Sequence, residues 1–133
     1  MPQQGIGSCR LLDRWIEAIS RRDSEAVVGL YDPEAQLWGT LAAQLRTDPD
    51  AFADYFRRFL ACDCMRAELG DVELRTLTDG LVLAAGDYRF FWKNASDREE
   101  TQARARFTMV LGEREGSWRI LQHHSSEWLG DGF

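Results

Sequence analysis

Two adjacent histidines, His123 and His124, are the residues best suited to proton chemistry, because the sequence holds no other histidine. An imidazole exchanges a proton near neutral pH and can act as a general acid or base. Neighbouring residues of a regular strand point to opposite faces. The apolar residues Trp118 and Ile120 indicate which face is the inner one, and this face also carries His124 and Ser126. We therefore predict that His124 and Ser126 bind a ligand, with His124 as the candidate catalytic residue.

Other interpretations of the histidine pair remain open at this point. Both rings can be structural, held by hydrogen bonds near the end of the last strand, and His123 is expected at a rim or subunit interface. A metal site is disfavoured, because no further histidine and no glutamate at helical ligand spacing accompanies the pair. Cys62 and Cys64 are one residue apart, unlike a usual zinc knuckle. We expect free thiols, no metal and no cofactor.

Four aromatic residues are candidates for the wall of a binding cavity: Trp38, Tyr55, Tyr88 and Trp92. Large rings bury the surface of a ligand, while a few polar groups fix its orientation. The alternative is that such rings only fill the core of a small domain.

The elements that must position these residues follow from hydrophobic periodicity and turn signals. Apolar residues at helical spacing predict an N-terminal helix, with Ser8 as a plausible N-cap, and Asp23 or Ser24 can cap a second helix. Pro33 predicts a turn over residues 31–34, and Gly70 and Gly86 predict bends within strands. Helices are predicted at 8–22, 24–30 and 47–62, and strands at 35–40, 65–77, 81–92, 99–111 and 118–128.

The order of these elements predicts one α+β domain over residues 1–133, with a curved antiparallel meander and N-terminal helices on its concave face. The net charge of −6 argues against a nucleic-acid partner. No apolar run is long enough for a membrane span or a signal peptide. With three unpaired cysteines, these features favour a cytoplasmic protein that uses neither nucleic acid nor membrane as a partner.

Several strings resemble the nuclear transport factor 2-like superfamily, and within it bacterial relatives of the calcium/calmodulin-dependent protein kinase II association domain and the SnoaL-like polyketide cyclases. The strings are LYDPEA at 30–35, LWGT at 37–40, ARFTMV at 105–110 and GSWRILQHHSS at 116–126. The resemblance implies a cone-shaped, cystatin-like α+β barrel with a cavity open at one end. It also implies homodimers formed through the outer sheet face, and it places Arg106 in or beside the pocket.

We therefore expect a domain for small-ligand binding or oligomerisation with an aromatic-lined pocket. Its ligand would be a small, partly apolar molecule with an anionic group, held by Arg106 and His124. The alternative is an isomerase, dehydratase or cyclase that uses His124 as general acid or base on a small carbonyl compound. A third possibility is a partner domain for a larger protein encoded separately.

Overall fold

The sheet is built from four long strands that follow one another along the chain. The computed structural model describes residues 2–130, with side chains from residue 6 onward. The strands β2 (Cys64–Thr78), β3 (Leu81–Lys93), β4 (Thr101–Arg114) and β5 (Ser117–Glu127) pair as an antiparallel meander. Gly80, with φ at 74°, makes the tight β2–β3 turn in the left-handed region that glycine favours. The predicted meander and its Asp79–Gly80 hairpin are confirmed.

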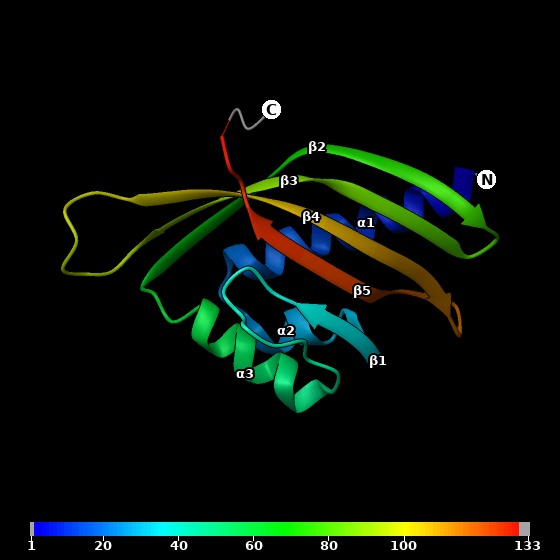
Figure 1. Ribbon diagram of the computed structural model, residues 1–133, viewed down its shortest axis with the longest axis horizontal. Coiled ribbons are helices and arrows are strands. Elements are labelled where there is room, and N and C mark those ends of the chain that lie inside the picture. The colour runs from blue at the N-terminus through cyan, green and yellow to red at the C-terminus, as the bar shows by residue number, and fades with distance from the viewer. Residues whose placement is uncertain (1, 131–133) are drawn as a thin grey trace.

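The first strand, β1 (Tyr31–Trp38), pairs with β5 in parallel and makes the sheet mixed. The strand order is β1-β5-β4-β3-β2, and the sheet curves without closing on itself (Figure 1). The predicted turn at residues 31–34 is wrong, because these residues begin β1. Asp32 still accepts a hydrogen bond from the Glu34 amide at 2.9 Å, and the β1–β5 register shifts between Tyr31 and Gln36. An edge strand tolerates Pro33 at such an irregularity.

Helices cover one side of this sheet, beneath its curve (Figure 1). They are α1 (Pro2–Ser20), α2 (Ser24–Val28) and α3 (Pro49–Phe59). In α1, Trp15 stacks on Tyr88 of β3 with ring centroids 5.2 Å apart. Ser8 is not the N-cap that we predicted: it lies inside α1 and is buried. Asp23 does cap α2, where its side chain accepts a hydrogen bond from the Ala26 amide at 3.1 Å.

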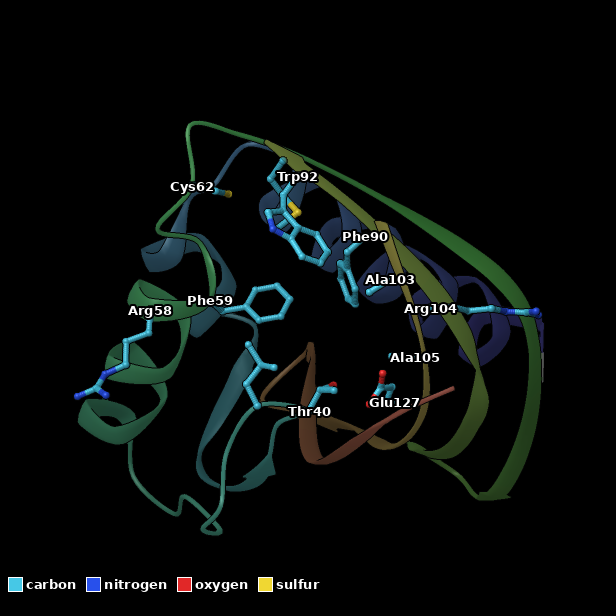
Figure 2. Close-up of a pocket in the computed structure, with 12 residues that line it drawn as sticks. Thr40, Arg58, Phe59, Cys62, Phe90, Trp92, Ala103, Arg104, Ala105 and Glu127 are labelled. Atoms are coloured by element: carbon cyan, nitrogen blue, oxygen red, sulfur yellow. The ribbon is translucent and has the colours of Figure 1, made fainter. Parts of the chain in front are cut away.

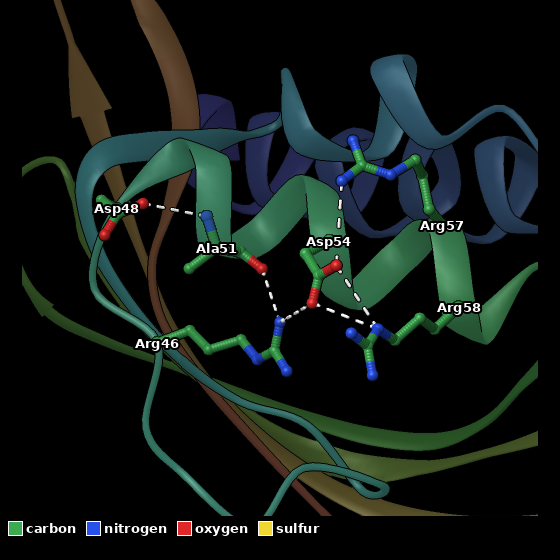
Figure 3. Close-up of polar contacts among 6 residues, drawn as sticks. All are labelled: Arg46, Asp48, Ala51, Asp54, Arg57 and Arg58. Atoms are coloured by element: carbon green, nitrogen blue, oxygen red, sulfur yellow. Dashed lines mark hydrogen bonds and ion pairs between the residues drawn. The ribbon is translucent and has the colours of Figure 1, made fainter.

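Helix α3 is tied to the segment that precedes it by a cluster of polar side chains (Figure 3). Asp48 caps the helix by accepting a hydrogen bond from the Ala51 amide at 2.9 Å. Arg46 donates to the Ala51 carbonyl at 2.9 Å and to the Asp54 carboxylate at 3.0 Å, and Arg58 donates to the same carboxylate at 3.3 Å. The hydrogen bond from Arg46 lowers the pKa of Asp54. This cluster holds residues 46–48 against α3.

The inner face of α3 presents Phe52, Tyr55 and Phe56 to the core, and Phe59 is half-buried beside them. This placement matches the helical spacing of the four rings. No helix in the described part of the chain is long and apolar enough to cross a bilayer.

Candidate functional site

A β-bulge in β5 decides which histidine faces the interior. Ile120 pairs with Leu111, but the next pair towards the end of β5 is Gln122 with Val110, so Leu121 is an extra residue. A bulge of one residue reverses the alternation of side chains beyond it. His123 is therefore buried, at 2% exposure, while His124 is exposed. The prediction that His124 faces the cavity is wrong, because it assumed a regular strand.

The two nitrogens of His123 each meet a tyrosine hydroxyl in the core. The Tyr31 hydroxyl lies 2.7 Å from Nδ1, and the Tyr88 hydroxyl lies 3.0 Å from Nε2. The indole N–H of Trp15 donates to the Tyr31 hydroxyl at 3.1 Å. All three aromatic partners are buried. A buried polar ring is costly unless its hydrogen bonds are made, and here both nitrogens have a partner.

The hydrogen bonds continue from this buried ring towards a cavity. The Tyr88 hydroxyl donates to the Ser125 hydroxyl at 2.6 Å. Ser125 in turn lies 2.6 Å from the Thr40 hydroxyl. Thr40 is half-buried, and its side chain lines the cavity. A continuous series of hydrogen bonds thus joins Trp15 in the core to the cavity wall.

Burial controls the protonation of this network. Removal from water lowers the pKa of His123 to about 3, and the neighbouring His124 lowers it further. The ring is therefore neutral at pH 7. Burial also raises the pKa of both Tyr31 and Tyr88 above the usual range, so both hydroxyls keep their protons.

The cavity has a volume of about 400 Å³ and opens beside α3 (Figure 2). Its wall is mainly apolar, and the three rings among its lining side chains come from Phe59 of α3 and from Phe90 and Trp92 of β3. A crevice of about 10 Å³ shares Thr40, Phe59 and Phe90 with the cavity and also touches His123. The volume and the apolar wall are those of a small-molecule site.

Few polar groups face this cavity. Thr40 and Glu127 lie on the same side of it, and the Arg58 and Arg104 side chains point away from it (Figure 2). The Cys62 thiol also lies at the wall, and burial raises the pKa of that thiol. Thr40 and Glu127 therefore contribute a hydroxyl and a carboxylate that can orient a ligand.

The predicted aromatic residues divide between the cavity and its surroundings. Trp92 lines the cavity, and Tyr55 and Tyr88 line the crevice. Gly39 allows the Tyr55 ring to approach closely, because a Cβ at Gly39 would lie 2.1 Å from that ring. Trp38 is 40% exposed and stacks on His124, with ring centroids 5.9 Å apart. It lies outside the cavity.

The polar residues predicted for the pocket lie on the outer face of the sheet. Arg106 is exposed between the buried residues Ala105 and Phe107, so the expectation that it faces the cavity is wrong. Ser126 follows the inward-facing Ser125 and points the other way for the same reason as His124. Arg104 also belongs to the outer face, where it donates to Asp87 at 2.9 Å.

Sequence reasoning did not single out Thr40, Phe59, Phe90 or Glu127 as cavity residues. Their spacing carries no motif, since they come from a loop and three separate elements. Only the tertiary arrangement brings them together. No group of three potential metal ligands is found among the described residues.

Comparison with known proteins shows which proteins the chain is similar to. A model of the SnoaL-like domain family matches residues 10–129. A structure from Xanthomonas campestris, provisionally assigned as a calcium/calmodulin-dependent protein kinase II association domain, is 28% identical with a TM-score of 0.82. The alignment covers 92% of this chain and 86% of that one. These matches confirm the resemblance that the sequence strings predicted.

Two further structures share the fold at low identity. A provisionally assigned scytalone dehydratase from Novosphingobium aromaticivorans is 8% identical with a TM-score of 0.83, covering 97% of this chain and 89% of that one. A provisionally assigned dehydratase of the nuclear transport factor 2-like family from Streptomyces avermitilis is 16% identical with a TM-score of 0.81. The coverage is 97% of this chain and 99% of that one. No curated protein sequence matches the chain.

The buried neutral ring makes stability depend on pH. An unfolded histidine has a pKa near 6.5, so below that pH the unfolded chain binds a proton that folded His123, with its pKa of about 3, does not. Stability is fully present above about pH 6.5 and falls as the pH drops towards 3. We expect His123 to account for a loss of about 2 kcal/mol in the free energy of unfolding between pH 7.5 and 5.0, measured by urea unfolding.

The His123→Gln variant should lose this part of the pH dependence, and the exposed-site control His124→Gln should keep it. Equal pH dependence in the wild-type protein and His123→Gln would show that the ring is not held neutral by burial.

Proposed function

The chain belongs to the SnoaL-like domain family, and we propose that it binds a small, largely apolar molecule in the cavity beside α3. The fold alone does not define an activity. The observation that carries the proposal is a cavity of about 400 Å³ with an apolar, ring-lined wall and few polar groups. Such a site favours a flat ring system with one or two polar substituents.

The charges around the cavity favour a neutral ligand over an anionic one. The sequence predicts an anionic ligand held by Arg106 and His124, but neither residue lines the cavity. Arg58 and Arg104 turn their guanidinium groups away from it, and Glu127 contributes a carboxylate (Figure 2). An anionic group placed beside Glu127 would be repelled.

A cavity-filling substitution tests the binding proposal. We expect the neutral bicyclic ketone 1-indanone to bind with a dissociation constant at or below about 1 mM, measured by calorimetry or ligand-detected NMR. Ala103 lines the cavity, so Ala103→Trp should abolish binding by occupying the space. The exposed neighbour Gln102 lies on the opposite face of β4, and Gln102→Trp should leave binding unchanged. Indane-1-carboxylate should bind more weakly than 1-indanone. Binding that survives in Ala103→Trp would contradict the proposed location.

A second function, proton transfer at a carbon next to a carbonyl, is favoured by Glu127 and Thr40 on the same side of the cavity. A carboxylate can abstract the proton, and a hydroxyl donor can stabilise the enolate oxygen that forms. The two dehydratase assignments among the structural neighbours are compatible with such chemistry. In this proposal Glu127 takes the role of base that the sequence suggested for His124.

Hydrogen exchange tests this second function without a known substrate. We expect the protein to accelerate exchange of the C2 hydrogens of 1-indanone in D2O, followed by NMR. Glu127→Gln should lower the protein-dependent rate by at least about a hundredfold, and Glu73→Gln on exposed β2 should not change it. Exchange at the rate of buffer alone would exclude this function for 1-indanone and leave the binding proposal standing.

We also propose that two copies of the chain form a homodimer through the outer face of the sheet. A row of paired residues crosses this face: Trp38, His124, Thr108 and Ala85. All four are exposed, and the helices lie on the other side of the sheet (Figure 1). An exposed indole at one end of an uncovered sheet face is typical of an interface.

A charge in the middle of this row tests the dimer. We expect light scattering to give twice the mass of one chain for the wild-type protein and the mass of one chain for Thr108→Glu, since two copies related by a twofold axis would bring the charges together. Arg57→Glu, on the exposed side of α3, should remain dimeric. A wild-type protein that is monomeric at all concentrations would refute the proposal.

A further inference from the structure

The direction of the hydrogen bonds between His123 and Thr40 carries a further inference, which rests on the proposed binding function. We propose that the Thr40 hydroxyl is a fixed hydrogen-bond donor to the ligand, so that the cavity selects molecules with a carbonyl-type acceptor. Each hydroxyl has only one hydrogen to donate, so the donor of one hydrogen bond fixes the direction of the next.

The Tyr88 hydroxyl determines which atom donates in its hydrogen bond with His123. Its hydroxyl donates to Ser125 at 2.6 Å, which uses its single hydrogen. At 3.0 Å from the His123 Nε2 atom, the same oxygen must therefore accept. It follows that Nε2 of His123 carries a hydrogen.

The hydrogen bonds at the other nitrogen of His123, Nδ1, agree with a hydrogen on Nε2. An indole N–H can only donate, so Trp15 donates to the Tyr31 oxygen at 3.1 Å. The Tyr31 hydrogen is then directed to Nδ1 of His123 at 2.7 Å. A neutral imidazole carries one hydrogen, on one nitrogen. Donation from Tyr31 to Nδ1 thus fits a hydrogen on Nε2.

The hydrogen bond that Ser125 accepts from Tyr88 determines how Ser125 interacts with Thr40. The Ser125 hydroxyl is buried and accepts from Tyr88. Its own hydrogen needs an acceptor, since a buried donor without a partner is costly. Within the described residues, the Thr40 oxygen at 2.6 Å is the acceptor in reach. Ser125 therefore donates to Thr40.

Thr40 is left with one hydrogen that no protein acceptor takes up in the described part of the chain. Its side chain lines the cavity, so this hydrogen is available to a ligand. Several hydrogen bonds in series polarise one another and strengthen the terminal donor. The Thr40 oxygen accepts the hydrogen of Ser125 in this arrangement, so the Thr40 hydrogen cannot point at Ser125 and is directed elsewhere.

The ligand class follows from this donor and from the Glu127 carboxylate, which only accepts when ionised. A ketone, aldehyde or amide oxygen on a small apolar ring matches Thr40. A hydroxyl or N–H elsewhere on the ligand would match Glu127. His123, Tyr88 and Ser125 are positioning residues in this scheme, because they act through Thr40.

Three bicyclic probes of nearly equal size separate these chemistries: 1-indanone has an acceptor only, indole a donor only, and indene neither. We expect the wild-type protein to bind 1-indanone about five- to tenfold more tightly than indene, the value of one neutral hydrogen bond. Indole has an N–H that matches Glu127 and no acceptor for Thr40, so its affinity reports on Glu127 and the ratio of indene to 1-indanone reports on Thr40. This comparison needs no variant.

Variants then assign the preference to Thr40. Thr40→Val keeps the shape of the side chain and should reduce the ratio of indene to 1-indanone dissociation constants to about one, with indene binding unchanged. Ser125→Ala should lower the ratio in part, since the Thr40 hydroxyl is then no longer held in one direction by the hydrogen bond with Ser125. Thr78→Val, at the exposed end of β2, is the matched control and should keep the wild-type ratio.

Nitrogen-15 NMR of the His123 ring measures which of its two nitrogens carries the hydrogen, and it needs no ligand. We expect a hydrogen on Nε2 and none on Nδ1. A hydrogen on Nδ1 would overturn the inference even if the cavity binds ligands. Equal binding of 1-indanone and indene would overturn it as well and leave the binding function intact, whereas no binding of any probe would refute both.

Discussion

The interior of this protein depends on how the imidazole of His123 is accommodated. A polar ring at 2% exposure is tolerated only where both nitrogens have partners. Tyr31 comes from β1, Tyr88 from β3 and Trp15 from α1, so three elements distant in sequence meet at one ring. The edge strand, the centre of the sheet and the long helix are fixed relative to one another by this requirement. Removing the hydroxyl of Tyr31 or Tyr88 leaves one nitrogen of the buried ring without its partner.

The outline of the fold could be predicted because it rests on local signals. Asp48 before Pro49, Asp79 before Gly80 and the aromatic stripe of α3 each act over a few residues, and the structure has them as expected. The start of β1 could not be predicted in this way, because Pro33 is acceptable only on an edge strand. Whether a strand lies at an edge is decided by tertiary pairing.

The site was less predictable than the fold for a related reason. The strict alternation of side chains from Trp118 onward predicts that His124 faces inward. The extra residue Leu121 reverses this alternation, so His124 faces outward. No glycine or proline marks that bulge in the sequence. Thr40 and Glu127 are also ordinary residues until the fold places both at one cavity. Trp92 lines the cavity, since a large ring on an inward strand position has few other places to go.

The outermost strand, β2, has a consequence for the behaviour of the protein at high concentration. A free strand edge can recruit another chain and start fibril growth. The bulge at Gly70 shifts the β2–β3 register between Leu69 and Val72 and interrupts the regular ladder. Charged side chains at Arg66, Glu68, Glu73 and Arg75 line the exposed parts of the same strand. An irregular, charged border of this kind is a poor template for cross-β assembly, so the sheet can stay open without polymerising.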